Sequence, residues 1–412
     1  MIFRLLIIVI LLSINLVLAQ DSTKVIELER RLKALEEKFE QSELEKIMKE
    51  AESIATEKAE KKETKVFKSG QRSLQALNPE ISVASDAFGQ FILNKDFFDE
   101  ENRSGAHFRV AEVQIQSPLD PFSTTKVILE FKPGDVEFAE AYLTWNRILP
   151  NISLTAGKFR QQFGVVNRWH AHALDQFDFP LALTTILGKE GLNQMGISLD
   201  WLLPPLFKSV NYLTLQLTNG QNEHLFAGEM FSFPVVLVHF KNYRDLNRDT
   251  YLEVGFTGME GTNNLRGYIA GEKIKEPVRW TRLAGLDLSF LWEPVARARY
   301  QYFLWRSELY YVNKELPGTN KITTWGGYSY LEYKFARRWH VGMRFDYTQP
   351  FKISNSGKYL YQIVPYVTWW QSPWVKLRLQ YNFLNGNVID QAKNTLRLQI
   401  TWAIGPHKHE RY

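Results

Sequence analysis

Apolar and strongly polar residues alternate along most of this chain, and this pattern limits the fold more than any other feature. Residues 375–383 read VKLRLQYNF and residues 396–402 read LRLQITW. Such alternation predicts strands with one apolar face and one charged or amide-bearing face. Unpaired charges cannot be buried in the dry core of a soluble β protein. A membrane barrel satisfies both faces, because apolar side chains meet lipid and polar side chains meet a water-filled interior.

Sixteen segments show the alternation, and the connections between them alternate in length. Connections after even-numbered segments are short, whereas those after odd-numbered segments are mostly long, as in transmembrane barrels. Most of the 12 tryptophans lie beside the short connections, as in an interfacial aromatic girdle. We therefore predict an all-β, 16-stranded antiparallel transmembrane barrel of the porin type. The predicted strands are 80–94, 107–116, 124–133, 135–148, 151–162, 194–203, 208–218, 233–243, 250–258, 281–293, 298–312, 322–334, 339–349, 358–370, 374–384 and 394–404.

The N-terminal residues follow different patterns. The first residues have the form of a cleaved secretory signal peptide, although an uncleaved anchor would show the same apolar run. A Glu- and Lys-rich stretch follows, in which apolar residues recur at spacings of 3, 4, 3 and 4 from Val25 to Phe39. This spacing predicts a short α-helical coiled coil, and a solvated amphipathic helix is the alternative. The predicted segments are a signal peptide (1–19), a periplasmic coiled-coil helix (20–65), a linker (66–79) and an outer-membrane barrel (80–412).

Composition excludes several classes of protein. The chain has no cysteine, which rules out disulfides and thiolate metal sites. Its net charge of +5 is small for 412 residues, and with the export signal it argues against a nucleic-acid partner. Sixteen strands enclose an aqueous channel, so we expect a passive channel and not an enzyme. His239 is the histidine best placed for hydrolysis, and it has no obvious serine partner at matching depth.

One connection, residues 163–193, is the longest and shows no alternation. It contains the apolar run FDFPLALTTILG at 177–188, which is unusual for a loop in water. The run would be stable against the inner wall or at a subunit contact, and the first of these fits a pore constriction better. We therefore expect this third external loop to fold into the barrel and set its narrowest section.

The segment before this loop, AGKFRQQFG at 156–164, resembles the G-K-F-R-x-x-F-G pattern of the phosphate-selective porin O/P-like family. The likeness in strand plan extends over about residues 80–412. It implies a 16-stranded, trimeric outer-membrane channel whose third loop narrows the pore. The N-terminal coiled coil and the histidines of the third loop set this chain apart from the best-known members, and they suggest a subgroup of porin-like receptors.

Charged residues at alternating positions are the candidates for ion selectivity. Lys158 and Arg160 are two residues apart, so we expect both to face the lumen, either attracting anions or pairing with glutamates such as Glu130. The predicted constriction residues are Lys158, Arg160, Arg168, His170, His172, Asp175 and Asp178. The predicted lumen charges include Glu112, Glu140, Arg344, Arg378 and Arg397. The small positive excess among the lumen charges favours anions.

His170 and His172 are candidate metal ligands. In an extended chain they share a face, and imidazole is a good ligand for zinc. Asp175 and Asp178 are near enough in sequence to complete a site. Histidines that fix the loop by hydrogen bonds, or that gate it by protonation, are the alternatives. We expect no resident cofactor, with zinc as the one candidate.

The sequence therefore predicts a passive channel for small ions or solutes in the outer membrane of a Gram-negative bacterium. We expect outer-membrane lipid around it, a homotrimer, and a periplasmic envelope partner for the coiled coil. Two alternatives stay open: a ligand- or metal-gated receptor acting through His170 and His172, and a barrel that anchors the envelope through its coiled coil.

Overall fold

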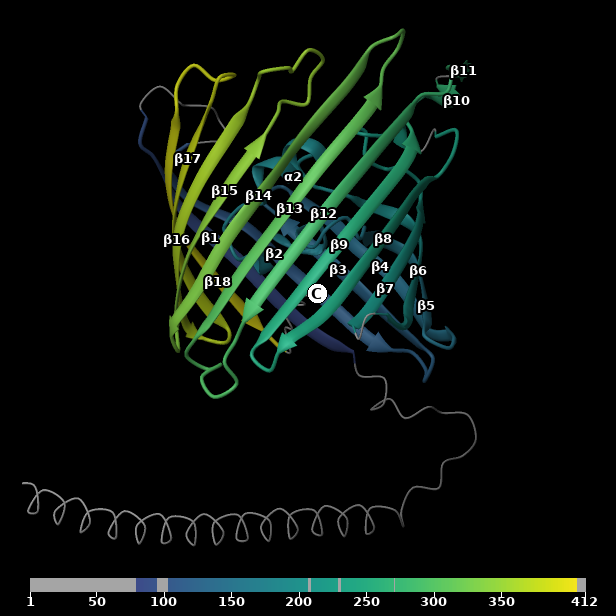
Figure 1. The fold of residues 1–412 in the computed structure, drawn as a ribbon. Helices are drawn as coiled ribbons and strands as arrows, with labels where there is room; N and C mark the ends of the chain where they lie inside the picture. Colours follow the sequence, from purple (N-terminus) through teal and green to yellow (C-terminus); the bar gives the residue numbers. More distant parts are fainter. Residues whose placement is uncertain (1–78, 95–102, 207–208, 229–230, 270, 406–412) are drawn as a thin grey trace, which may run out of the picture. The chain divides into compact units, whose positions relative to one another are not determined.

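The computed structural model describes residues 79–94, 103–206, 209–228, 231–269 and 271–405. Sixteen antiparallel strands form one closed barrel, in which each strand pairs with its sequence neighbours and β1 pairs with β18 (Figure 1). The predicted fold class is confirmed. The signal peptide (1–19), the coiled coil (20–65) and all but the last residue of the linker (66–79) lie outside the described residues. None of the helices in the described part has the length and hydropathy of a membrane-crossing helix.

The barrel strands follow the predicted segments closely. They are β1 (Glu80–Ile92), β2 (Gly105–Pro118), β3 (Ser123–Lys132), β4 (Asp135–Leu149), β5 (Ile152–Arg160), β6 (Asn193–Leu206), β7 (Ser209–Thr218), β8 (Val235–Asn247), β9 (Thr250–Thr262), β12 (Trp280–Trp292), β13 (Tyr302–Glu315), β14 (Lys321–Ala336), β15 (Trp339–Thr348), β16 (Leu360–Ser372), β17 (Val375–Gly386) and β18 (Lys393–Ile404).

Many strand boundaries differ from the prediction by a few residues. The connection expected after residue 258 begins only after Thr262, and it contains the hairpin of β10 (Arg266–Ile269) and β11 (Glu272–Lys275). β13 begins at Tyr302 and not at 298, because Arg297 accepts backbone hydrogen bonds in a tight turn. Because β5 ends at Arg160 and β6 begins at Asn193, the third external connection spans 161–192, where the prediction gave 163–193.

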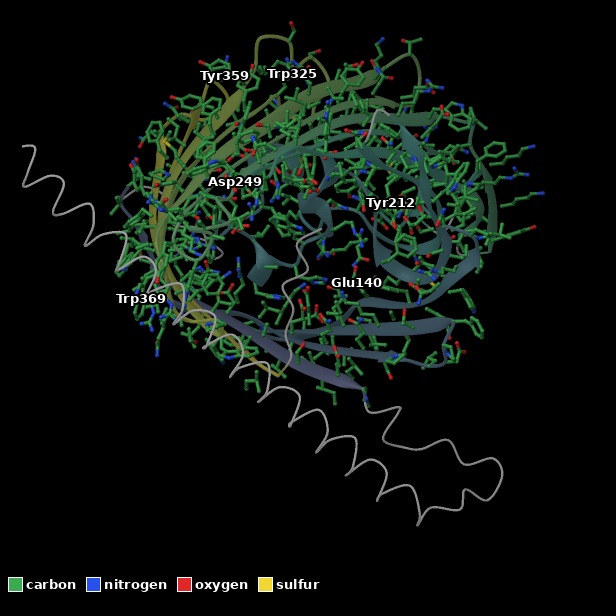
Figure 2. All side chains as sticks on the ribbon, turned by 60° about the horizontal axis from the view of Figure 1, so that its bottom comes forward. Glu140, Tyr212, Asp249, Trp325, Tyr359 and Trp369 are labelled. Carbon is green, nitrogen blue, oxygen red and sulfur yellow. The ribbon has the colours of Figure 1, made fainter. Side chains whose placement is uncertain are left out.

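Side chains alternate between the two faces of the wall as the sequence predicts. On β17, Lys376 and Arg378 are buried, whereas Leu379 is 44% exposed. On β15, Arg344 is fully buried and Met343 is 52% exposed. Buried charge beside exposed apolar side chains is the reverse of a soluble protein, and it is the pattern of a barrel wall in lipid. Figure 2 looks into the barrel from the end that carries the short turns.

A bulge in β4 changes this alternation near the external end. Ile128 of β3 pairs with Glu140, but Leu129 pairs with Phe138, so Ala139 is an extra residue. The bulge allows Glu137 and Glu140 both to pair with inward-facing positions of β3 although they are three residues apart. It thereby adds a carboxylate to the inner wall.

Residues 161–192, named the internal loop below, lie inside the barrel. They include two short 3-10 helices, η3 (Val166–Arg168) and η4 (Ala171–Ala173), and the helix α2 (Leu181–Leu187). The helix α2 packs against β13, β14 and β15 (Figure 1). Gly164 and Gly188 have positive φ angles of 65° and 90° and reverse the chain at both ends of this segment.

Candidate pore and its internal loop

Apolar contacts hold much of the internal loop against one side of the inner wall. Leu183, Ile186 and Leu187 of α2 are fully or almost fully buried in a cluster with wall residues such as Leu237 and Val312. Each buried leucine or isoleucine contributes roughly 1.5–3 kcal/mol. The cluster explains why an apolar run occurs in an external connection: it forms a small hydrophobic core inside the barrel.

Glu308 of β13 binds the start of the internal loop. Its Oε1 accepts hydrogen bonds from the backbone N–H groups of Val165 and Val166, at 3.2 and 3.0 Å. Its carboxylate also accepts hydrogen bonds from the hydroxyls of Tyr310 (2.8 Å) and Tyr328 (2.5 Å). At Gly164, a Cβ atom would lie 1.9 Å from Glu308 Oε2, so only glycine allows this close approach.

Basic residues of the wall bind backbone carbonyl groups of the internal loop. Arg109 donates to the carbonyl of Ala171 at 3.0 Å, and Arg344 donates to that of Asp178 at 2.7 Å. Two further bonds of this kind are Lys376 to His172 O (2.8 Å) and Arg378 to Leu174 O (3.0 Å). The predicted lumen charges Arg344 and Arg378 therefore position the loop.

Asp178 and Asp175 anchor the internal loop through arginines. Asp178 lies 3.1 Å from Arg344 and 3.5 Å from Arg397. Burial raises the pKa of Asp178, but these two guanidinium groups outweigh it and leave the pKa below its usual range. Asp175 accepts a hydrogen bond from Tyr330 and lies 3.7 Å from Arg306. The prediction that these aspartates complete a metal site with the histidines is wrong, because both aspartates lie beside arginines instead.

His170 instead collects three glutamates from three neighbouring strands. Its Nδ1 atom lies 2.9 Å from Glu112 Oε2 and 3.2 Å from Glu130 Oε1, and its Nε2 atom lies 3.5 Å from Glu140 Oε2. His172 lies 3.4 Å from the same Glu112 oxygen. Burial lowers the pKa of His170, but the charge of Glu112 and hydrogen bonds to all three carboxylates raise it well above its usual value overall.

Two lysines complete the charge balance around His170. Lys132 lies 3.1 Å from Glu130, and Lys126 lies 3.9 Å from Glu140. The possible metal-ligand atoms of Glu112, Glu130 and His170 all lie within 4.8 Å of one another. The donor set fits a zinc ion in type, since it combines imidazole with carboxylates.

The structure corrects the prediction for Lys158. Its cross-strand partners are Ala141 and Met195, and Met195 is 48% exposed on the outer face. The inward position belongs to Phe159, which is buried. Lys158 reaches from the outer row to Glu137, 3.4 Å away. The prediction was wrong because it exchanged the inward and outward positions of this strand.

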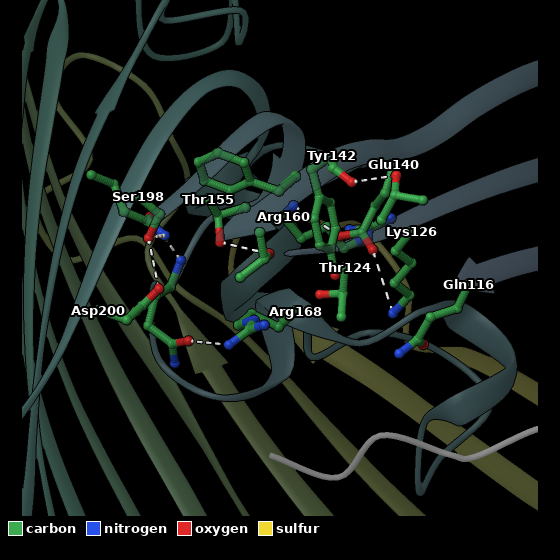
Figure 3. Close-up of a pocket in the computed structure, with 15 residues that line it drawn as sticks. Gln116, Thr124, Lys126, Glu140, Tyr142, Thr155, Arg160, Arg168, Ser198 and Asp200 are labelled. Atoms are coloured by element: carbon green, nitrogen blue, oxygen red, sulfur yellow. Dashed lines mark hydrogen bonds and ion pairs between the residues drawn. The ribbon is translucent and has the colours of Figure 1, made fainter. Parts of the chain in front are cut away.

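A polar cavity of about 240 Å³ lies between the internal loop and strands β2–β7 (Figure 3). Arg160 closes the end of β5 and donates to the carbonyl of Glu190 at 3.1 Å. Arg168 enters from the internal loop and donates to Gln162 at 2.6 Å. The lining residues are Gln116, Thr124, Thr125, Lys126, Glu140, Tyr142, Thr144, Thr155, Phe159, Arg160, Gln162, Arg168, Ser198, Asp200 and Gln216.

Sequence reasoning missed several residues of this cavity. Lys126 and Asp200 stand on inward rows of β3 and β6, so strand alternation alone could have identified them. Glu308 could not have been found in this way, because its role depends on the loop that packs on it. Neither could the gathering of three glutamates around His170.

Comparison with known proteins agrees with the barrel. No family model matches the chain. An uncharacterized protein from Aquifex aeolicus (strain VF5) is 26% identical over 276 residues, which cover 62% of this chain and 57% of that protein. This chain therefore matches little more than half the length of that relative.

Solved structures of similar fold are outer-membrane proteins. An anion-selective porin from Comamonas acidovorans has a TM-score of 0.54 at 8% identity, over 80% of this chain and 100% of that chain. OprB from Pseudomonas putida has a TM-score of 0.53 at 11% identity, over 80% and 95%. The trimer form of the outer membrane protein OmpT from Vibrio cholerae has a TM-score of 0.52 at 10% identity, over 80% and 99%. At these identities the likeness concerns the fold.

Proposed function

We propose that this protein is an outer-membrane channel for the passive diffusion of small polar solutes, with the internal loop as its constriction. The observation that carries the proposal is the uneven filling of the barrel. The apolar residues of the internal loop pack against the wall on the side of β8–β14, and a polar cavity remains on the side of β2–β7. A hydrated path between polar side chains is what a diffusion channel requires.

A weak preference for anions follows from the charges that line the cavity. Lys126, Arg160 and Arg168 face two carboxylates, Glu140 and Asp200. Glu140 also lies beside His170, which reduces its effect on a passing anion. Fixed charge in a narrow pore selects by sign, so the excess of one positive charge favours anions.

Single-channel recording tests the proposal. The refolded protein in a planar bilayer under a KCl gradient is expected to give stable conductance steps. Its reversal potential is expected to lie closer to the equilibrium potential of chloride than to that of potassium. An absence of conductance from a barrel shown to be folded would contradict the channel. A reversal potential on the potassium side would contradict the anion preference and leave the channel intact.

We also propose a homotrimer surrounded by outer-membrane lipid, with the short-turn end in the periplasm. The trimer form of OmpT supports this assembly by analogy of fold. Native mass spectrometry is expected to give three chains per particle, and a single chain would contradict it. Residues 20–65 retain their proposed role in holding an envelope partner. Their deletion is expected to abolish co-purification of that partner and to leave conductance unchanged.

The cluster around His170 supports a second candidate function, a channel that divalent cations regulate. The cluster joins the internal loop to β2, β3 and β4. The candidate is supported by the ligand atoms of Glu112, Glu130 and His170, which lie within 4.8 Å of one another. Micromolar zinc is then expected to change the conductance of the native protein and to have no effect after Glu130→Gln. An equal response in both proteins would contradict this candidate.

A further inference from the structure

The inner wall beside the polar cavity carries an uninterrupted row of hydroxyl and amide side chains (Figure 3). Each member of the row stands directly opposite the next on the neighbouring strand, and the row crosses β3, β4, β5, β6 and β7. All members line the cavity, and none of them carries a charge. The row, named the hydroxyl belt below, consists of Thr124, Thr144, Thr155, Ser198 and Gln216.

The hydroxyl belt stops where the apolar cluster of the internal loop begins. Its last member, Gln216 of β7, stands opposite Leu237 of β8. Leu237 is fully buried in the apolar cluster. The belt therefore belongs to the space that remains beside the internal loop, and a solute in this space meets it.

The hydroxyl groups of the belt have capacity for hydrogen bonds to a solute. The hydroxyl oxygens of Thr144 and Thr155 lie 2.9 Å apart. The hydroxyl of Ser198 accepts from Gln216 at 3.1 Å and donates to Asp200 at 3.3 Å. Each hydroxyl group has one donor and two acceptor positions. These three bonds therefore leave at least one further position on each of the three oxygens.

A tyrosine and two glycines form the next row toward the external end. Tyr142 stands opposite Gly157, and Gly157 stands opposite Gly196. The wall has no side chain at the two glycines, so bare backbone follows the tyrosine on that side. At Gly157 a Cβ atom would lie 2.3 Å from the carbonyl oxygen of Ala141, so a larger residue does not fit. An aromatic ring that lines the cavity thus borders an open strip beside the hydroxyl belt.

Two carboxylates near the belt are engaged with other groups of the protein. Glu140 lies 3.9 Å from Lys126, and Asp200 accepts a hydrogen bond from Thr214 at 2.6 Å. The small excess of positive charge in the cavity acts on passing ions. An uncharged belt beside an aromatic ring instead favours a neutral solute that carries many hydroxyl groups.

We propose that this part of the cavity binds an uncharged saccharide ring, with one face of the ring on Tyr142 and its hydroxyl groups on the hydroxyl belt. This binding rests on the proposed channel function and names a solute class for it. A saccharide ring has C–H groups on its faces and hydroxyl groups around its edge, so it matches an aromatic row beside a hydroxyl row. The cavity of about 240 Å³ has the volume of about eight water molecules at about 30 Å³ each, which leaves room for a monosaccharide. Hydrogen-bonding groups that line a pore select among solutes in this way.

Block of the single-channel current by glucose tests this site. Glucose is expected to reduce the KCl current of the native protein in a saturable way. Mannitol carries similar hydroxyl groups on an open chain without a ring face, and it should reduce the current far less at the same concentration. Tyr142→Ala should raise the half-blocking glucose concentration about tenfold, because the aromatic contact is lost. Tyr142→Phe keeps the ring and should stay close to the native value.

A variant of the hydroxyl belt tests the other half of the site. Thr155→Val removes one hydroxyl group and keeps the shape of the side chain, so it should raise the half-blocking glucose concentration about threefold. Thr401→Val is the matched control, because Thr401 is buried on the inner row of β18 and does not line the cavity. The control should block like the native protein.

Equal block by glucose and mannitol, or equal shifts in Tyr142→Ala and Tyr142→Phe, would overturn the saccharide site. Saturation-transfer NMR of glucose with the full-length protein in detergent micelles measures binding without conduction. No glucose signal from a folded barrel would overturn the site whether or not the protein conducts. A signal that Tyr142→Ala removes, from a barrel that does not conduct, would support the site and contradict the proposed channel.

Discussion

The two sides of the barrel interior both carry inward-facing basic residues, but one side is packed by the internal loop and the other lines a polar cavity. On the packed side, formed by β8–β18, arginines bind the carbonyl groups and aspartates of the internal loop, and an apolar cluster fills the space. On the open side, formed by β2–β7, Lys126, Arg160 and Arg168 line a polar cavity. The comparison teaches that an inward-facing charge in a barrel does not by itself line a pore. What decides its role is whether the internal loop packs over it or leaves it at the wall of the polar cavity.

Removing the internal loop should have the largest effect on conduction. Replacing residues 165–187 by a short Gly-Ser linker takes away the apolar cluster and exposes the packed side to water. We expect single-channel conductance to rise by about twofold or more, because conductance grows with the open cross-section of a water-filled barrel. A deletion of the β10–β11 hairpin is the control and should leave conductance unchanged. Unchanged conductance after the first deletion would show that the loop does not restrict flow.

Truncating an apolar side chain should cost more stability inside the barrel than on its lipid-facing side. Ile186→Ala removes a fully buried side chain and is expected to cost roughly 2–5 kcal/mol of unfolding free energy. Leu379→Ala, on the lipid-facing row, leaves no cavity inside the barrel and should cost less. Denaturant unfolding in detergent micelles measures both. Equal losses would mean that the internal loop is not a packed core.

Charge removal should affect selectivity on the open side and stability on the packed side. Arg168→Gln is expected to move the reversal potential toward the potassium side, since it removes the excess positive charge of the cavity. Arg344→Gln removes the same charge from the packed side, where Arg344 binds Asp178 and Asp346. It should lower the unfolding temperature and leave the reversal potential in place. The opposite assignment of the two effects would contradict the comparison.

Acid should weaken the attachment of the internal loop at Asp178. The pKa of this carboxyl is lowered in the folded protein because Arg344 and Arg397 stabilise its charge against the effect of burial. A lowered pKa contributes stability above the unfolded value of about 3.9, and this contribution is lost as the pH falls through the folded value. The native protein should therefore lose unfolding free energy as the pH is lowered from 5, and Asp178→Asn should lose less over the same range. Denaturant unfolding at each pH measures both. An unchanged pH profile would contradict the role of this ion pair.

Strand alternation predicted the barrel well because lipid and water impose opposite demands on adjacent residues. The number of strands, their order and most inward rows, such as that of Lys376 and Arg378, follow from this rule alone. The error at Lys158 is one of phase and not of the rule. β5 pairs with β6 without a register shift, with Phe159 inward and Lys158 in the row of the exposed Met195, so regular alternation already places Lys158 outward.

The internal loop could be predicted only in outline. Its length and apolar run indicated that it packs on something, but not which wall residues receive it. The partners of Asp178 lie more than 160 residues away in sequence, on β15, β17 and β18. His170 illustrates the same limit, since its glutamates come from three separate strands. Local patterns carry no information about such distant contacts.

Cysteine labelling tests most directly whether solutes pass along the open side. The chain has no native cysteine, so single cysteines can be placed at Thr144 on the open side and at Ser289 on the packed side. A cationic methanethiosulfonate reagent added during recording should reduce the current through Thr144→Cys and leave that through Ser289→Cys unchanged. Block at Ser289→Cys without block at Thr144→Cys would place the path on the other side of the internal loop and contradict the account.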